Sequence, residues 1–283
     1  MSEGVAEQRQ AGPAHPPVRL LRRPPRRGAR RKLLLCVAYA GGGSTAYESW
    51  QRLLPETMDA QTLRLPGREA RTDELLPDDL RGLATDAAVE LGPYLTDPFA
   101  IFGHSMGALI AYEFAQALRK LFDIEPSCLL VSGMRPPDQA SLLGRYEGMD
   151  DEELRSAVAS MADTSPEALV DSELWELVRP VIGSDLAMCD SYAHVPAEPL
   201  RCPLVVYGSK HDDLDGDILN AWGAYTTGPF HTRIFPGDHF YFRRWPDAFA
   251  MDLIKRFYRY VMNDLHPGLD MLTGRRSGAR GAG

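Results

Sequence analysis

Six short apolar runs alternate along this chain with stretches that have helical spacing. The runs are residues 33–38, 61–65, 99–103, 128–132, 203–207 and 231–235. Continuous apolarity over a strand is typical of a parallel sheet with helices on both faces, whereas apolar and polar residues alternate in a strand that has one face exposed to solvent. The helical windows are residues 78–95, 107–121 and 246–262. The pattern predicts an α/β fold with a doubly wound, mostly parallel sheet and right-handed crossovers.

One interval of the chain is too long for a simple crossover. About seventy residues separate the run ending at Ser132 from the run starting at Pro203, far more than a crossover needs. The helix signals within it are a capped helix over residues 153–161, a start at Ser165, and a stretch over residues 172–192. Ligands bind at the carboxyl ends of strands in open sheets. We therefore expect this insert, about residues 140–195, to be a helical lid or else a packing elaboration.

Charge is distributed unevenly between the body of the chain and its ends. The net charge is −8, yet residues 1–32 hold nine Lys or Arg against two Glu, with five prolines among them. Such a segment is a poor core former and is usually solvated rather than bound to nucleic acid. We expect a disordered basic arm over residues 1–32, one folded domain over residues 33–265 and a disordered tail over residues 268–283.

The chain has no recognisable membrane or export segment. No stretch approaches about 18 consecutive apolar residues, and residues 1–30 lack the apolar run of a signal peptide. Its four cysteines are scattered without a CxxC pair, and three lie in apolar runs. These observations predict a cytoplasmic protein without a membrane partner, whose thiols are buried rather than paired in disulfides.

A Gly-His-Ser-Met-Gly motif at residues 103–107 directly follows one apolar run and precedes a helical window. A serine between two glycines in this strand, turn and helix context is typical of a nucleophile elbow. The glycines let the chain turn tightly and let the helix pack close to the strand. The alternative is a glycine-rich turn with a chemically silent serine. As a nucleophile, Ser105 would need a base and an acid that orients the base.

His239 is the candidate base, because it follows the last apolar run and precedes the last helical window. The order serine, acid, histidine is the one expected of this architecture. The acid is expected in the polar turn after residues 203–207, where Asp212 is preferred and Asp213 is the alternative. Asp238 is too close in sequence to orient its neighbour's ring easily.

Three consecutive glycines follow the first apolar run, within residues 39–44. Because glycine has no Cβ, the backbone amides of this loop can come close to a ligand. Together with the amide of Met106, one of them could form an oxyanion hole. A phosphate cradle is the weaker interpretation, because the segment lacks the Lys and Ser/Thr of a P-loop. The sequence has no metal-ligand spacing. We therefore expect neither a metal nor a cofactor.

Taken together, these motifs resemble the type II thioesterases that serve polyketide synthases and nonribosomal peptide synthetases, within the α/β-hydrolase fold. The similarity runs from about Arg22 to Tyr260. It rests on residues 40–43, 47–50, 65–69, 103–113, 134–137, 150–199 and 237–241. Ala38 and Tyr39 differ from the Pro and His that commonly precede the glycine run, and Asp213 stands where a Pro often follows the acid.

The resemblance implies a serine hydrolase that removes acyl groups from the phosphopantetheine arm of acyl or peptidyl carrier proteins. It favours an editing role, in which stalled or aberrant acyl units are cleared. It also implies Ser105, Asp212 and His239 as the catalytic triad, and the amides of Ala40 and Met106 as the oxyanion hole.

Further residues are candidates for substrate binding. Gly41, Gly42 and Arg135 are expected to line the substrate site, and Arg68 or Arg71 are further candidates for the phosphate of the arm. The same catalytic residues would also suit a small-molecule carboxylesterase or lipase. A third alternative is a catalytically silent hydrolase fold that acts as a binding partner.

Overall fold

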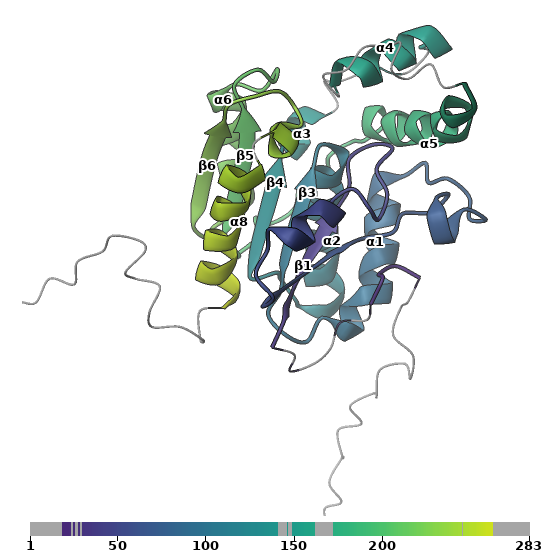
Figure 1. The fold of residues 1–283 in the computed structure, drawn as a ribbon. Coiled ribbons are helices and arrows are strands. Elements are labelled where there is room, and N and C mark those ends of the chain that lie inside the picture. Colours follow the sequence, from purple (N-terminus) through teal and green to yellow (C-terminus); the bar gives the residue numbers. More distant parts are fainter. Residues whose placement is uncertain are drawn as a thin grey trace, which may run out of the picture.

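The computed structural model describes residues 19–262, apart from residues 24, 26, 27, 29, 141–145, 147, 148, 162–171 and 245. Within these residues, six strands form one sheet (Figure 1). They are β1 (Lys32–Val37), β2 (Met58–Thr62), β3 (Ala100–His104), β4 (Cys128–Ser132), β5 (Leu204–Ser209) and β6 (Phe230–Phe235). The spatial order is β2-β1-β3-β4-β5-β6, and all neighbouring pairs run parallel. The predicted parallel α/β sheet is therefore confirmed.

Helices cover both faces of the sheet, and this is why its inner strands are apolar at successive positions. Leu35 of β1 belongs to the apolar cluster that includes α1 (Leu80–Leu91) and α2 (Met106–Phe122). The next residue, Cys36, belongs to the cluster that includes α8 (Pro246–Val261). Successive side chains of a strand point to opposite faces, so both faces demand apolar residues.

The strand order creates a switch point between β1 and β3. After β1 the chain passes to β2 on one side of it and then returns to β3 on the other side. In open α/β sheets, ligands bind outside the carboxyl ends of the strands at such a point. The loop after β1, residues 38–44, and the turn after β3, at Ser105, flank this switch point.

The observed strands agree with the predicted runs except at the edge strand β2. Strand β4 has the predicted bounds, and β1, β3, β5 and β6 begin and end within two residues of theirs. Strand β2 covers Met58–Thr62 rather than residues 61–65. The leucines that suggested the later position lie beyond the strand, in a loop where the amide of Arg64 donates to the carbonyl of Leu20. Their apolar character reflects burial of that loop and not membership of the sheet.

The long interval between β4 and β5 contains helices α3 (Pro137–Ala140), α4 (Asp151–Met161) and α5 (Ser172–Asp190). Helices α4 and α5 lie beyond the carboxyl ends of the strands (Figure 1). They pack through Trp175, whose indole Nε1 donates to Asp151 at 2.9 Å and whose ring lies 4.9 Å from the guanidinium of Arg155. The predicted helix start at Ser165 lies outside the described residues.

The N-terminal segment is bound to the fold where it is described. Leu20 and Leu21 are 2% and 0% exposed, within the same apolar cluster as α1 and α2. Arg23 donates from its amide to Gln61 and from its guanidinium to Asp59. The expected disordered arm therefore does not extend over these residues, because two adjacent leucines pack into the core. Residues 1–18 and the predicted tail lie outside the described residues.

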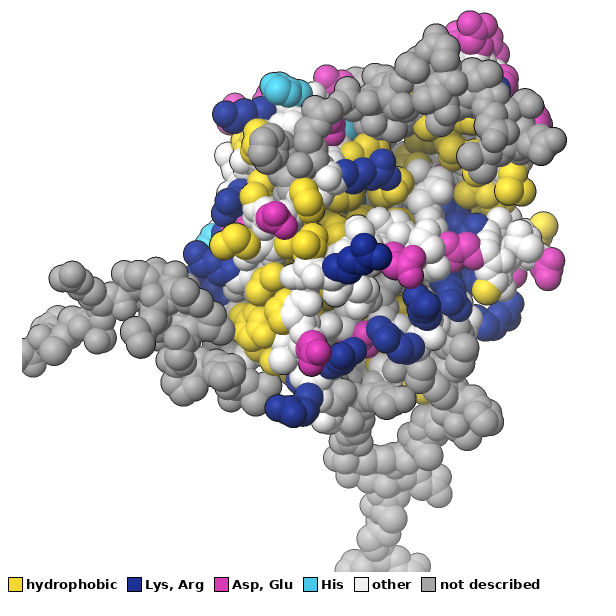
Figure 2. All heavy atoms as spheres, in the orientation of Figure 1, with side chains coloured by type: hydrophobic (Ala, Val, Ile, Leu, Met, Phe, Trp, Pro, Cys, Tyr) yellow, Lys and Arg dark blue, Asp and Glu magenta, His cyan; other side chains and the backbone are white. Residues whose placement is uncertain are grey.

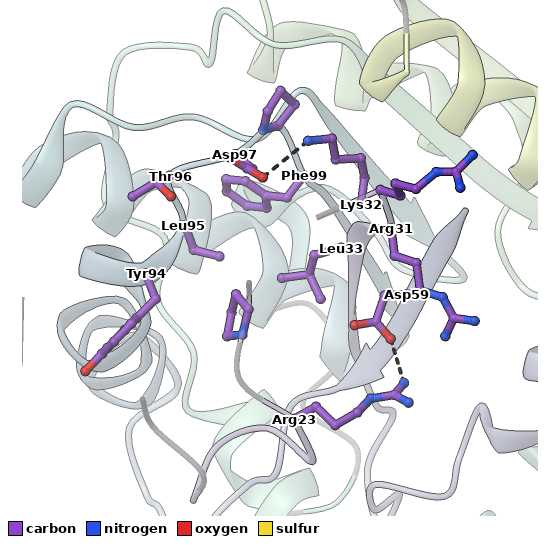
Figure 3. Close-up of a pocket in the computed structure, with 13 residues that line it drawn as sticks. Arg23, Arg31, Lys32, Leu33, Asp59, Tyr94, Leu95, Thr96, Asp97 and Phe99 are labelled. Carbon is purple, nitrogen blue, oxygen red and sulfur yellow. Dashed lines mark hydrogen bonds and ion pairs between the residues drawn. The ribbon is translucent and has the colours of Figure 1, made fainter. Parts of the chain in front are cut away.

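Apolar and charged side chains lie on different parts of the face that Figure 2 shows. Apolar side chains gather beneath α4 and α5, whereas Lys and Arg gather lower on this face among Asp and Glu. A cavity of about 610 Å³ opens at the amino edge, near the starts of β1 and β3 (Figure 3). Two of its cationic side chains, Arg23 and Lys32, are paired with Asp59 and Asp97. Its lining includes none of Ser105, Asp212 and His239, which follow the carboxyl ends of their strands. Among the described residues, no helix has the length and apolarity that crossing a bilayer requires.

Leu21 is a direct test of the packed N-terminal segment. Leu21→Ala is expected to lower the free energy of unfolding by about 2–5 kcal/mol, because it removes buried apolar contacts and leaves a cavity. Leu75 is 92% exposed, and Leu75→Ala should change that free energy by less than about 0.5 kcal/mol. Chemical denaturation of both variants measures the difference. Equally small effects would contradict a core role for the segment.

Candidate active site

Ser105 lies in a sharp turn between β3 and α2. Its backbone has φ 55° and ψ −127°, in a region that costs a non-glycine residue about 1–3 kcal/mol and that clusters at functional sites. A Cβ on Gly103 would collide with the carbonyl of Gly107, and a Cβ on Gly107 would collide with the carbonyl of Val37. The turn thus has the close packing that the nucleophile elbow predicts.

Backbone hydrogen bonds hold the serine turn in place. The amide of Ser105 donates to the carbonyl of Ser132 at the end of β4, and its carbonyl accepts from the amide of Ala108 in α2, each at 2.8 Å. The serine itself is half-buried rather than enclosed. The strained conformation is therefore anchored to a neighbouring strand and to the first turn of a helix.

His239 and Asp212 form a hydrogen-bonded pair. His239 Nδ1 lies 2.8 Å from Asp212 Oδ2, and the two side chains are 15% and 12% exposed. The other carboxylate oxygen, Oδ1, accepts from the amide of Asp213 at 3.0 Å. Sequence reasoning left Asp212 and Asp213 as alternatives, and the structure brings Asp212 to the imidazole.

The acid and the imidazole come from the loops that follow β5 and β6. The amide of Lys210 donates to the carbonyl of Phe235 at 2.9 Å, and the amide of His211 donates to the carbonyl of Gly237 at 3.1 Å. These bonds continue the β5–β6 pairing to the ends of the strands and beyond. The sheet itself therefore sets the spacing between the two side chains.

The imidazole of His239 lies beside the residue that immediately precedes Ser105. Its ring centroid is 4.6 Å from that of His104, and a Cβ on Gly133 would lie 3.1 Å from its Cε1. His239 Nε2 is buried and has no hydrogen-bond partner among the described residues. Since Nδ1 is engaged by a carboxylate, the neutral ring would carry its hydrogen there and keep Nε2 as the free base.

His104, the residue before Ser105, belongs to a buried chain of polar side chains beneath the serine turn. It is fully buried, and its Nδ1 lies 2.9 Å from Ser132 Oγ, which is 2.7 Å from the hydroxyl of Tyr241. Burial lowers the pKa of His104 well below its ordinary value, and the nearby His239 and Arg243 lower it further. Sequence reasoning missed this polar chain, because its members are 28 and 109 residues apart and no local pattern joins them.

The glycine loop after β1 presents its amides in different directions. Gly41 has φ 76°, a left-handed conformation that favours glycine, and its amide donates to Asp185 of α5 at 2.8 Å. The amide of Gly42 donates to the carbonyl of Tyr39 at 2.8 Å. Within the described ranges, the amides of Ala40 and Met106 donate to no other group. Those two amides are available to a ligand oxygen.

The arginines expected to meet a phosphate have different environments. Arg68 forms a buried ion pair with Asp185. Arg71 donates to both carboxylate oxygens of Glu74, at 3.0 and 2.6 Å. Both guanidinium groups are therefore paired with carboxylates of the protein, Arg68 with a residue far away in the sequence and Arg71 with a residue three positions along the chain. Arg135, just after β4, is half-buried and forms no ion pair with another described residue.

Residues 32–257 match the thioesterase domain family. The chain belongs to this family. Gramicidin S biosynthesis protein GrsT of Aneurinibacillus migulanus is 34% identical over 209 residues, which cover 74% of this chain and 82% of GrsT. Thioesterase PikA5 of Streptomyces venezuelae is 30% identical over 210 residues, which cover 74% of each chain.

Solved structures agree with this family membership. RedJ, a thioesterase from the prodiginine pathway of Streptomyces coelicolor, has a TM-score of 0.74 at 33% identity, covering 87% of this chain and 90% of RedJ. BorB, the type II thioesterase from the borrelidin biosynthetic cluster, has a TM-score of 0.73 at 30% identity, covering 86% and 99%. The thioesterase therefore has the α/β-hydrolase fold and is a hydrolase that acts on thioesters. The predicted family and fold class are confirmed.

His104 makes the stability of the thioesterase depend on pH. A histidine in the unfolded chain binds a proton below about pH 6.5, whereas burial holds the pKa of His104 in the folded protein well below that value. Stability is therefore expected to fall with pH below that value, with His104 contributing about 1.4 kcal/mol per pH unit. His104→Asn should remove this part of the slope in denaturation curves between pH 7 and 5, with His211→Asn as the exposed control. Parallel slopes for the wild type and His104→Asn would contradict a neutral His104.

Proposed function

We propose that this thioesterase hydrolyses acyl groups from the phosphopantetheine arm of acyl and peptidyl carrier proteins in polyketide or nonribosomal peptide biosynthesis. The observation that carries the proposal is the Asp212–His239 pair, at the same sheet edge as the strained turn of Ser105. The relatives support the pathway class, since GrsT is named for gramicidin S biosynthesis and BorB as a type II thioesterase. An editing role, which clears stalled or aberrant acyl units, fits this type.

The first chemical step forms an acyl-enzyme. Ser105 Oγ attacks the thioester carbonyl while His239 Nε2 takes the hydroxyl proton, and Asp212 holds the imidazole tautomer and stabilises its cation. The amides of Ala40 and Met106 bind the oxyanion that develops on the carbonyl oxygen. The C–S bond then breaks, and the imidazolium returns its proton to sulfur. The pantetheine thiol leaves, and the acyl group remains as an ester of Ser105.

The second step releases the acyl group as a carboxylic acid. His239 Nε2 takes a proton from a water molecule, and the hydroxide so formed attacks the ester carbonyl. The same two amides bind the second oxyanion. The bond to Ser105 Oγ then breaks, and the imidazolium protonates that oxygen. The cycle uses only groups of this chain and water.

Helices α4 and α5 and Arg135 are the proposed contacts of the acyl arm. Four apolar side chains of these helices, among them Trp175 and Ile182, cluster against Ala40. An acyl chain whose carbonyl reaches Ala40 would therefore meet an apolar surface, as a lid requires. Arg135 is the remaining candidate for the phosphate of the arm, because guanidinium groups bind phosphate through charge-assisted hydrogen bonds. Gly41 and Gly42 would line the approach beside Ala40.

The proposed place of action is the cytoplasm. All four cysteines of the thioesterase are free and buried, which suits a reducing compartment. Burial also raises the pKa of the Cys202 thiol to about 12. These cysteines are therefore suited to packing and not to redox chemistry.

Substitutions in the proposed triad test the mechanism. Ser105→Ala and Asp212→Asn are each expected to lower kcat for an acyl-pantetheine thioester by about 10³-fold or more, because the nucleophile or the correct imidazole tautomer is lost. Asp213→Asn makes the same charge change one residue away and should leave kcat within about threefold of wild type. Steady-state kinetics of the three folded variants measures the effects. An equal loss in Asp213→Asn would disprove the assignment of the acid.

A matched substrate series tests the substrate class. Carrier-bound acyl thioesters are expected to be hydrolysed with a higher kcat/KM than a pantetheine thioester or an oxygen ester of the same acyl chain, because carrier and arm add contacts beyond the acyl group. Each rate is measured with the wild type and with Ser105→Ala as the background control. A preference for the oxygen ester would favour a carboxylesterase instead.

A further inference from the structure

A buried ion pair joins helix α5 to the loop that follows β2. Arg68 and Asp185 are 7% and 0% exposed at their side chains. Their contact is bidentate, with 2.8 Å between Nη1 and Oδ2 and 2.6 Å between Nη2 and Oδ1. Burying two charges is costly, so such a pair persists where its geometry and further hydrogen bonds compensate. The chemical steps above use neither side chain.

The same two side chains also hold the glycine loop after β1. Asp185 Oδ2 accepts from the amide of Gly41 at 2.8 Å, and Arg68 Nη1 donates to the carbonyl of Gly42 at 3.0 Å. The carboxylate therefore binds the amide N–H of Gly41, and the guanidinium binds the carbonyl of the next residue, Gly42. The donor belongs to the peptide unit that links Ala40 to Gly41, so its direction constrains the backbone at Ala40.

Helix α5 contacts this loop through one face. Ile182 and Asp185 are three residues apart and share that face, and the side chain of Ile182 fills the space that a Cβ on Gly41 would need. Leu186 of α5 belongs to the apolar cluster that packs against Ala40. Apolar contact alone can seat the helix, whereas the ion pair and its hydrogen bonds also determine the direction of the loop's peptide units.

We propose that Asp185, with Arg68 as its counter-charge, is a positioning residue that sets the oxyanion loop from helix α5. The inference rests on the proposed oxyanion hole of Ala40 and Met106. Because the amide of Gly41 donates its hydrogen bond to Asp185, the neighbouring amide of Ala40 is the one that remains available to the oxyanion. The oxyanion hole is then complete only while α5 is seated, and one carboxylate couples the seating of this helix to the chemistry.

Asp185→Asn tests the coupling, because it keeps the size of the side chain and removes the charge opposite Arg68. We expect kcat for an acyl-pantetheine thioester to fall about 10- to 100-fold, with KM changed less than about threefold. The affinity for a boronic acid that forms a tetrahedral adduct on Ser105 should fall by the same factor, because the adduct requires the oxyanion hole. Glu176→Gln removes a charge from an exposed position of the same helix and should change neither quantity.

Two results would overturn the inference. In one, folded Asp185→Asn keeps wild-type kcat and boronate affinity, and in the other the whole loss appears in KM. If this variant does not fold, Arg68→Lys takes its place, because it keeps the positive charge but loses the guanidinium group that bonds both Asp185 and the carbonyl of Gly42. The same changes in kcat, KM and boronate affinity are then expected, and the same two results would overturn the inference. Failure of the proposed function gives a different result, namely turnover that survives Ser105→Ala.

Discussion

Helix α2 approaches the end of strand β1 so closely that position 107 has no room for a side chain. This contact holds the turn between β3 and α2 in a conformation that a serine would not adopt by itself. It also brings the first amide of α2 beside the loop that leaves β1. The serine and both proposed oxyanion donors thus depend on one packing contact, at the switch point where a parallel sheet opens.

Part of this arrangement could be read from the sequence because it depends on local patterns. Strand β4 was predicted to the residue, since a strand buried on both faces has sharp apolar limits. The serine turn and His239 were found because glycines and strand ends mark them. Strand β2 was predicted three residues too late, because an edge strand tolerates polar residues and the buried loop beyond it does not.

Other features depend on the path of the chain in space. The choice between Asp212 and Asp213 requires the geometry of the loop after β5, which strand pairing with β6 sets. Arg68 and Asp185 are 117 residues apart, and no pattern in either segment indicates the other. The resemblance included the segments around both residues but assigned neither role. Removing one partner of such a buried pair costs about 3–5 kcal/mol, because the other charge is left without compensation.

The N-terminal residues have a consequence for the outer side of the sheet. Strand β2 is an edge strand, and open edges invite pairing with other molecules and hence aggregation. Here the carbonyl of Leu20 binds the chain just past β2, while Arg23 engages two side chains of the strand itself. This short segment therefore lies against part of the border of the sheet. A truncation intended to keep the protein monodisperse should cut before Arg19, since a later cut would leave more of that border open to pairing with another molecule.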